Sequence, residues 1–187
     1  MILGLIPARA GSKRVHMKNM RMFCGKPLVG WTIEAALASG MLDDVVVSSD
    51  SDEILAYAGL LACRAERRPD WLSTDDASVY DLVRWFLKSE RPEAIVLLQP
   101  TSPLRIADDI DDQLRCYLDG ASMSVSEGSV EGNGAIYAAP AWRWRHRCFN
   151  FDNSPGVSFF SMPASRSIDV NTEDDFARAE AMMRERA

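Results

Sequence analysis

The 187-residue sequence contains no apolar run near the ~20 residues that a membrane-spanning helix needs. Its first residues, MILGLIPARAGSKR, are apolar first and basic second, the reverse of the order in a secretory signal. Its four cysteines are scattered and lack C-x-x-C spacing, so neither a zinc site nor a disulfide framework is expected. We therefore expect a cytoplasmic protein with reduced thiols and no membrane partner.

Acidic residues are absent from residues 1–33, although this stretch carries six lysines and arginines. The net charge of −6 is thus the difference between +6 in this stretch and −12 in the remainder. An acidic chain is not attracted in bulk to nucleic acid, so we expect no nucleic-acid partner. A small cationic patch in such a chain indicates a site for one small polyanion, and a solvated basic face is the alternative.

Short apolar or β-branched runs alternate with amphipathic stretches along the chain. Strands are expected at residues 1–7, 44–48, 94–98, 122–126 and 134–138, and helices at 29–37, 52–58, 79–87, 106–117 and 172–186. Alternating strands and helices predict an α/β fold with a mostly parallel, Rossmann-like sheet covered on both faces, a three-layer α/β/α sandwich. No repeat or long linker divides the chain, so one domain over residues 1–187 is expected.

Polar segments follow three of the expected strands, at residues 8–19, 48–52 and 99–105. Ligands of parallel α/β sheets bind beyond the carboxyl ends of the strands, so these segments predict one shared site. Asp50, in the second segment, is equally suited to capping the helix that follows and to a nucleotide or metal role.

The basic loop (residues 8–19) lies within the stretch IPARAGSKRVHMKN. Gly11 permits a close backbone approach to a ligand, and Arg9, Lys13 and Lys18 could surround a triphosphate. The stretch has neither the G-x-x-x-x-G-K-[ST] spacing of a Walker A loop nor the G-x-G-x-x-G spacing of a dinucleotide site.

This loop resembles the nucleotide-binding signature of the acylneuraminate (CMP-sialic acid) cytidylyltransferase family. That family includes the enzymes for pseudaminic and legionaminic acid and is related to the CMP-Kdo synthetases. The resemblance continues, in the family's order, at residues 24–40, 43–54, 67–78, 96–105, 133–137 and 167–180. It implies the nucleotide-diphospho-sugar transferase type of fold, CTP and an acidic sugar as substrates, and Mg²⁺ as cofactor.

The resemblance also implies a role for individual residues. The CTP phosphates would be held by Arg9, Ser12, Lys13, Lys18 and Asn19. Arg68 would contact the cytosine or ribose, and Ser78 would belong to the same nucleotide site. The sugar would be bound by Gln99 and Tyr137, with Arg105 supporting the loop of Gln99. Catalysis is assigned to Arg9, Lys18 and Asp169, and metal binding to Asp169 together with Asn171.

Plainer interpretations exist for several of these residues. Arg68 could form a surface pair with Arg67, residues 99–103 could be only a turn before a helix, and Asp169 could be structural. The two histidines, His16 and His146, match no base of the family, so no dedicated general base is expected.

The sequence departs from the family's pattern in two places. Where the family has a dimerisation arm with basic residues for the sugar carboxylate, only EGSVEG (residues 127–132) remains, so a homodimer is possible but not implied. Asn171 stands where the family usually has a second aspartate. Its amide oxygen could bind Mg²⁺, but we favour an N-cap on the last helix, with Asp174 three residues on; Thr172 is the other candidate for this cap.

The basic, aromatic tract WRWRHR (residues 142–147) is not explained by the resemblance. A plain surface or packing role is favoured, and the alternative is that Arg143 and Arg145 replace the missing arm in holding the sugar carboxylate. Nucleic-acid contact has little support in so short a tract. At the level of the whole chain, the alternatives to a sugar-acid cytidylyltransferase are an inactive nucleotide-binding protein and a transferase for another acceptor.

Overall fold

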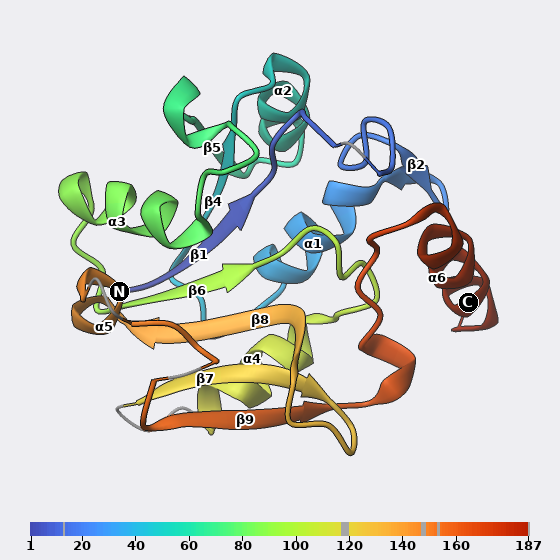
Figure 1. Cartoon of the computed structure of the whole chain (residues 1–187). Coiled ribbons are helices and arrows are strands. Elements are labelled where there is room, and N and C mark those ends of the chain that lie inside the picture. Colours follow the sequence, from blue (N-terminus) through green and yellow to red (C-terminus); the bar gives the residue numbers. More distant parts are fainter. Residues whose placement is uncertain (13, 117–119, 147–148, 153, 187) are drawn as a thin grey trace.

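A computed structural model describes the chain except for residues 13, 117–119, 147–148, 153 and 187. Figure 1 shows a central sheet flanked by helices. The strands are β1 Ile2–Pro7, β2 Met22–Phe23, β3 Lys26–Pro27, β4 Asp44–Ser49, β5 Arg64–Arg67, β6 Ala94–Leu98, β7 Ala121–Ser126, β8 Gly132–Pro140 and β9 Val157–Met162. The α-helices are α1 Leu28–Leu37, α2 Asp52–Leu60, α3 Val79–Ser89, α4 Ala107–Arg115, α5 Ala141–Arg145 and α6 Glu173–Arg186.

The main sheet has seven strands in the order β5-β4-β1-β6-β8-β7-β9. Among the strands described, β8 runs against the others, because a link of a few residues joins it to β7 as a hairpin and is too short for a crossover. The carboxyl ends of β1, β4, β5 and β6 therefore meet the amino end of β8 at one edge of the sheet. The expected mostly parallel α/β fold is confirmed.

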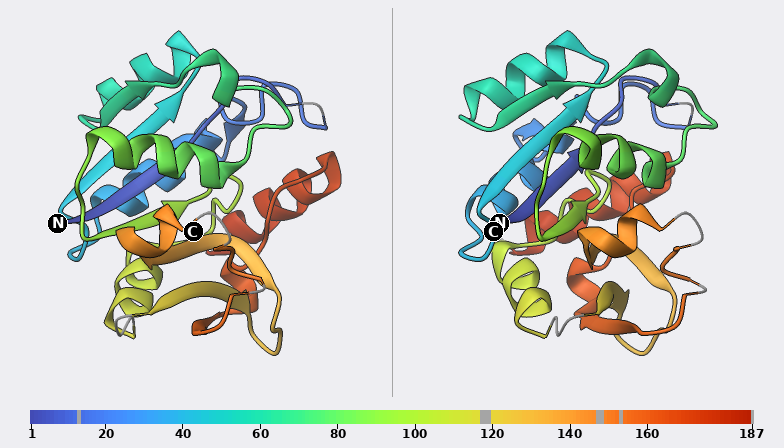
Figure 2. Two further views of the ribbon diagram at one scale, coloured as in Figure 1. Left: turned by 60° about the vertical axis from the view of Figure 1, so that its left-hand side comes forward. Right: turned by 90° about the vertical axis from the view of Figure 1, so that its left-hand side faces the viewer.

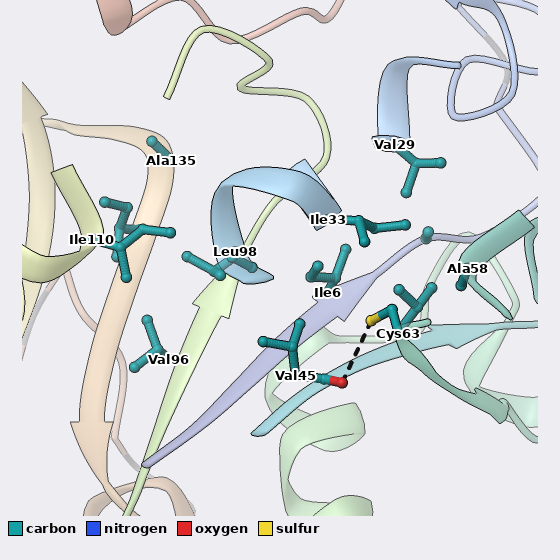
Figure 3. Close-up of a cluster of buried hydrophobic side chains, with 14 of the residues drawn as sticks. Ile6, Val29, Ile33, Val45, Ala58, Cys63, Val96, Leu98, Ile110 and Ala135 are labelled. Atoms are coloured by element: carbon teal, nitrogen blue, oxygen red, sulfur yellow. Dashed lines mark hydrogen bonds between the residues drawn. The ribbon is translucent and has the colours of Figure 1, made fainter. Parts of the chain in front are cut away.

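Helices cover both faces of this sheet (Figure 2). One face buries side chains of α1, α2 and α4, among them Ile33 and Ile110, against Ile6 and Val96 (Figure 3). The other face buries Phe86 of α3 and Trp144 of α5 against strand residues of the opposite orientation. Since successive strand side chains point to opposite faces, the continuous apolar runs of β1 and β6 supply both clusters.

A third apolar cluster lies beside the main sheet and joins α6 to the small β2–β3 hairpin. Phe23 and Phe176 meet edge to face with ring centroids 5.4 Å apart. Arg21 stacks over the Phe176 ring at 4.1 Å and pairs with Glu173 at 2.5 Å. This packing brings the start of α6, at the far end of the sequence, next to the basic loop.

Several elements were not expected from the sequence. The two outermost strands of the sheet are β5, with the sequence RAER, and β9, with VSFFSM. The elements β2, β3 and α5 are very short. The charged residues of β5 do not give the apolar pattern from which a strand is predicted, because the outermost strand of a sheet has one side open to water. Among the described helices, none is long and apolar enough to cross a bilayer.

Candidate functional site

The basic loop leaves β1 at the edge of the sheet where the polar segments were expected to meet. Three hydrogen bonds fix its base: Ala8 N donates to Ser48 O at 2.9 Å, Ala10 N to Asp50 Oδ1 at 2.8 Å, and Asn19 Nδ2 to Arg9 O at 2.9 Å. The interpretation of Asp50 as a helix cap is wrong. The neighbouring residue Ser51 caps α2, and Asp50 holds the loop instead.

A cavity of about 320 Å³ opens between the basic loop, the segment after β6 and the segment before α6. The predicted site residues that line it are Arg9, Ser12, Lys18, Asn19, Gln99 and Asn171. Arg14 adds a further positive charge to its wall. Lys13 lies outside the described residues. The cavity is thus a cationic recess at the carboxyl edge of the sheet, as a triphosphate requires.

A second cavity, of about 230 Å³, adjoins the first and shares Pro7, Arg9, Asp75 and Gln99 with it. Its own lining includes Arg68 and Ser78. Ser78 also caps α3, since its hydroxyl accepts a hydrogen bond from Tyr80 N at 3.2 Å. The residues expected to hold the phosphates and those expected to contact the nucleoside therefore line two adjoining cavities.

Arg68 is a buried cation on the wall of this second cavity, with 6% of its surface exposed. Its Nη2 donates to Ser48 O at 3.0 Å, while its Nε has no hydrogen-bond partner within the described part of the chain. Burial lowers the pKa of Arg68 to about 10, against the raising effect of Asp50 and with a lowering effect of Arg9. The surface-pair interpretation is wrong for Arg68, because Arg67 alone turns outward, to Asp52.

Lys18 reaches across the first cavity to the segment before α6. Its Nζ donates to Val170 O at 2.8 Å, and Val170 N donates to Thr101 O at 2.8 Å. Burial lowers the pKa of Lys18, the neighbouring Asp169 opposes this, and Arg14 and Arg9 lower it further. Three segments that are distant in the sequence are therefore bound together around one lysine and one carboxylate.

Asp169 is held from two sides. Asn171 Nδ2 donates to its Oδ2 at 2.7 Å, and the backbone of Gly134, with φ +80°, passes so close that a Cβ there would lie 3.2 Å from Asp169 Cγ. The other oxygen, Oδ1, is buried and has no hydrogen-bond partner among the described residues. A carboxylate oxygen left free in this way is a suitable ligand for a hard divalent cation.

The part of the chain that the structure describes contains no group of three His, Cys, Asp or Glu side chains that could hold a metal by themselves. Mg²⁺ commonly binds through one or two carboxylates together with substrate phosphates, so Asp169 beside a phosphate-binding cavity fits this cation.

Of the two candidate caps of α6, Asn171 with Asp174 is wrong and Thr172 is confirmed. Thr172 Oγ1 accepts from Asp175 N at 3.2 Å, and Asp175 Oδ2 accepts from Thr172 N at 2.8 Å, which together form a capping box. The side chain of Asn171 is directed to Asp169 instead, and its backbone N–H donates to Asp175 at 3.0 Å.

Two predicted sugar residues, Arg105 and Tyr137, line neither of these cavities. Arg105 is only 2% exposed, and its guanidinium donates to Gln99 O, Ala135 O and Thr32 Oγ1. Burial lowers the pKa of Arg105 to about 9. This arrangement suits a support of the Gln99 loop and not direct contact with a sugar. Tyr137 is half-buried against Phe151, and burial raises its pKa to about 12, with further contributions from Asp152 and Asp169.

The alternative role of Arg143 and Arg145 in sugar binding is wrong. They belong to α5, which follows the antiparallel strand β8 and so lies beside the N-terminus at the opposite edge of the sheet (Figure 1). Arg143 donates to Pro155 O and Gly156 O there. Trp144 packs into the core, with its Nε1 donating to Ile95 O.

Two further residues at the site were not foreseen. Asp75 pairs with Arg9 at 2.8 Å, a contact across 66 positions for which the sequence carries no signal. Gly134 was expected only as part of a strand. A glycine near the start of a strand often marks a close backbone approach, so its role beside Asp169 had a recognisable signal.

The fold and the site define a nucleotidyltransferase type of protein. The structure of CMP:2-keto-3-deoxy-manno-octonic acid synthetase complexed with CTP resembles the chain with a TM-score of 0.81 at 15% identity, covering 100% of this chain and 99% of that one. The Rv0371c complex with manganese from Mycobacterium tuberculosis resembles it with a TM-score of 0.71 at 14% identity, covering 96% and 98%. Likeness at such identities shows the fold.

The chain belongs to the cytidylyltransferase family, whose sequence model matches residues 3–142. It is 40% identical over 117 residues to the N-acylneuraminate cytidylyltransferase of Escherichia coli O18:K1:H7, covering 62% of this chain and 28% of that protein. It is 35% identical over 147 residues to the CMP-N,N'-diacetyllegionaminic acid synthase of Legionella pneumophila, covering 75% and 61%. The chain therefore spans less than two thirds of the length of these relatives.

A third relative, N-acylneuraminate cytidylyltransferase B of Danio rerio, is 39% identical over 215 aligned positions that cover 94% of this chain and 50% of that protein. The alignment is longer than the 187 residues of the chain, so the relative has residues for which this chain has no counterpart. This agrees with a shortened member of the family.

Proposed function

We propose that this chain transfers CMP from CTP to an acidic sugar and releases pyrophosphate. The observation that carries the proposal is the pair of adjoining cavities at the sheet edge, bounded by Arg9, Lys18 and the segment of Asp169. The relatives named above, which act on neuraminic- and legionaminic-type acids, support an acidic sugar as acceptor. We propose that residues 1–187 form one nucleotidyltransferase domain.

The nucleotide would lie across both cavities. Arg9, Ser12, Lys13, Lys18 and Asn19 would surround the phosphates in the first cavity, and Arg68 and Ser78 would contact the nucleoside in the second. The buried Nε of Arg68, without a partner among the described residues, supports a polar contact that the nucleotide supplies.

The reaction would be an in-line displacement. The anomeric hydroxyl of the sugar forms a bond to the α-phosphorus of CTP, the bond between the α-phosphorus and the bridging oxygen breaks, and the hydroxyl proton passes to solvent. Such transfers depend mainly on positioning and charge neutralisation. Arg9 and Lys18 would stabilise the charge that develops on the α-phosphate oxygens. A site that works mainly through this stabilisation does not require a dedicated base.

Mg²⁺ is proposed as the cofactor. Asp169 Oδ1 and the amide oxygen of Asn171 are the protein oxygens that would hold it, beside oxygens of the triphosphate. The cation would neutralise phosphate charge and polarise the phosphorus.

The acceptor would lie near Gln99, supported through Arg105, with Tyr137 beneath. The hairpin link at residues 127–132 supplies no lysine or arginine for a sugar carboxylate. This observation favours, as a second candidate, transfer to a different acceptor or a nucleotide-binding protein without activity. A homodimer remains a prediction. The free thiols of Cys24, Cys63 and Cys116 support a cytoplasmic location.

Pyrophosphate release with CTP, Mg²⁺ and a panel of neuraminic, pseudaminic, legionaminic and Kdo-type acids tests the proposal. Turnover that depends on one of these acids is the expected result and names the acceptor. CTP binding without turnover on any of them would support the second candidate. Absence of CTP binding would refute both.

A further inference from the structure

The contacts around Asp169 determine how many negative charges a cation would meet in the absence of nucleotide. One carboxylate oxygen, Oδ2, already accepts a hydrogen bond from Asn171 Nδ2 at 2.7 Å. The backbone of Gly134 lies against the same carboxylate, so the side chain has little room to turn. Only Oδ1 is then left for a metal ion, and the neighbouring amide of Asn171 adds no charge.

Asp175 is a second carboxylate on this segment, but its charge is already engaged. Its Oδ2 accepts from the backbone N–H groups of Asn171 and Thr172 at 3.0 and 2.8 Å, and from the Thr172 hydroxyl at 2.8 Å. These bonds form the capping box of α6, and moving Asp175 toward a cation would break them. Asp175 is therefore a structural carboxylate whose Oδ2 is committed to the start of α6.

Among the described charged side chains that line the cavity beside Asp169, three are positive and one, Asp75, is negative and paired with Arg9 at 2.8 Å. Lys18 is bonded to the carbonyl of Val170, the residue next to Asp169, and Arg9 and Arg14 line the same cavity. Without nucleotide, a divalent cation would thus meet one carboxylate oxygen of Asp169 and several positive charges, because the Asp75 carboxylate is already paired with Arg9. The triphosphate of a nucleotide would reverse this balance, since it brings negative oxygens between the cations and Asp169.

We propose that Asn171 makes metal binding in this chain conditional on the nucleotide: the divalent cation is held by Asp169 only in company with the triphosphate. The inference rests on the proposed function, because it takes a nucleotide triphosphate as the ligand of the cavity. Its consequence is an order of binding in which the cation enters bound to the nucleotide.

Retention of Mn²⁺ by the full chain during ultrafiltration tests this inference without any need for turnover. The wild type, N171D and A177D are each filtered with Mn²⁺, with and without α,β-methylene-CTP, a nucleotide that cannot undergo the transfer. Ala177 is exposed on α6, so A177D adds the same charge six residues further along the chain than N171D. Circular dichroism confirms that the three proteins are folded.

The wild type and A177D are expected to retain Mn²⁺ only when the nucleotide is present. N171D is expected to retain Mn²⁺ without nucleotide, at least about tenfold more tightly than the wild type, since a second carboxylate then stands beside Asp169. Equal retention by the wild type with and without nucleotide would overturn the inference, and so would an unchanged N171D.

The same filtration separates this inference from the proposed function. The amount of nucleotide retained is measured alongside the metal. A wild type that retains neither nucleotide nor Mn²⁺ would refute the proposed function. The comparison of N171D with A177D would still decide whether Asn171 prevents the cation from binding without nucleotide.

Discussion

Arg9 and Asp75 form an ion pair, with Nη1 and Oδ1 2.8 Å apart, on the boundary between the two cavities of the site. Arg9 also donates to Thr74 O at 3.2 Å. Both side chains line both cavities, so a ligand that filled the two would pass directly over the pair. A phosphate group there would compete with the Asp75 carboxylate for the guanidinium of Arg9.

Replacing Asp75 with Asn should therefore strengthen CTP binding. Exposed ion pairs contribute about 0.2–1 kcal/mol, so an increase in affinity of roughly 1.4- to fivefold is expected when this competitor loses its charge. Isothermal titration of CTP measures it, with D76N as the matched control, because Asp76 is the exposed neighbour. Weaker binding by D75N would show instead that Asp75 contacts the nucleotide.

Arg68 and Arg67 are a natural pair for testing the nucleoside cavity. Arg68 lines the cavity and Arg67 pairs with Asp52 on the outside. R68M should weaken CTP binding by at least about tenfold, since a charged hydrogen-bond donor contributes about 1.5–3 kcal/mol, while R67M should leave it unchanged. Equal effects of the two substitutions on the CTP dissociation constant would contradict the assignment of Arg68.

Lys18 should matter for the chemical step more than for binding. Removing one preorganised group that stabilises transition-state charge costs about 10²–10³ in kcat, and a loss of this size is expected for K18M in pyrophosphate release. K88M is the control, because Lys88 lies on the exposed side of α3, away from the site. A fall in CTP affinity with unchanged kcat would show that Lys18 serves binding alone.

Arg143 and Arg145 should have no part in recognition of the acceptor. They lie on α5 at the edge of the sheet opposite the cavities, and Arg143 is bonded to the carbonyls of Pro155 and Gly156. The double variant R143M/R145M should keep the wild-type KM for the sugar acid and lose stability. A raised KM in an otherwise folded variant would reinstate these residues as acceptor ligands.

Cys63 should make the stability of the chain fall at high pH. Burial, aided by Asp44, raises the pKa of its thiol from 9.0 to about 11, and the side chain is only 5% exposed. The folded state therefore keeps a proton that the unfolded chain loses above pH 9, so this contribution is complete below pH 9 and is lost as the pH rises toward 11.

Urea unfolding at pH values below 9 and near 11 measures the effect. The free energy of unfolding of the wild type should fall more steeply between these pH values than that of C63A, which has no thiol to ionise. Parallel curves for the two proteins would mean that Cys63 is not shielded from water. At neutral pH, alkylation should modify the exposed Cys116 and spare Cys63 until the protein unfolds.

The central strands were predictable because their signal is local. The runs 1–7, 44–48 and 94–98 are apolar on both faces, and this pattern is what a buried parallel strand requires. The edge strands β5 and β9 were missed because each has one neighbour and is packed less completely. Charge and exposure in such strands remove the pattern on which the prediction depends.

At the site, the sequence located the segments but not the partners of each side chain. The polar residues after β1, β4 and β6 were expected to meet, since parallel strands end at the same edge, and they do. The alternative cap and sugar-binding roles of Asp50, Asn171 and Arg143 were wrong because each depends on a contact that local sequence does not contain. A cap, for instance, is decided by which of two adjacent residues turns toward the helix.

The sequence by itself determined the α/β class, the membership of the cytidylyltransferase family and the cationic loop after the first strand, because these follow from periodicity, charge and ordered motifs along the chain. The tertiary structure alone decided that Asp75 faces Arg9, that Gly134 and Asn171 hold Asp169 from two sides, and that α5 lies far from the cavities. For Gly134 and α5, the physical reason is the antiparallel course of β8. Because a short hairpin reverses this strand, its first residues reach the site while the residues that follow it are carried to the opposite edge of the sheet.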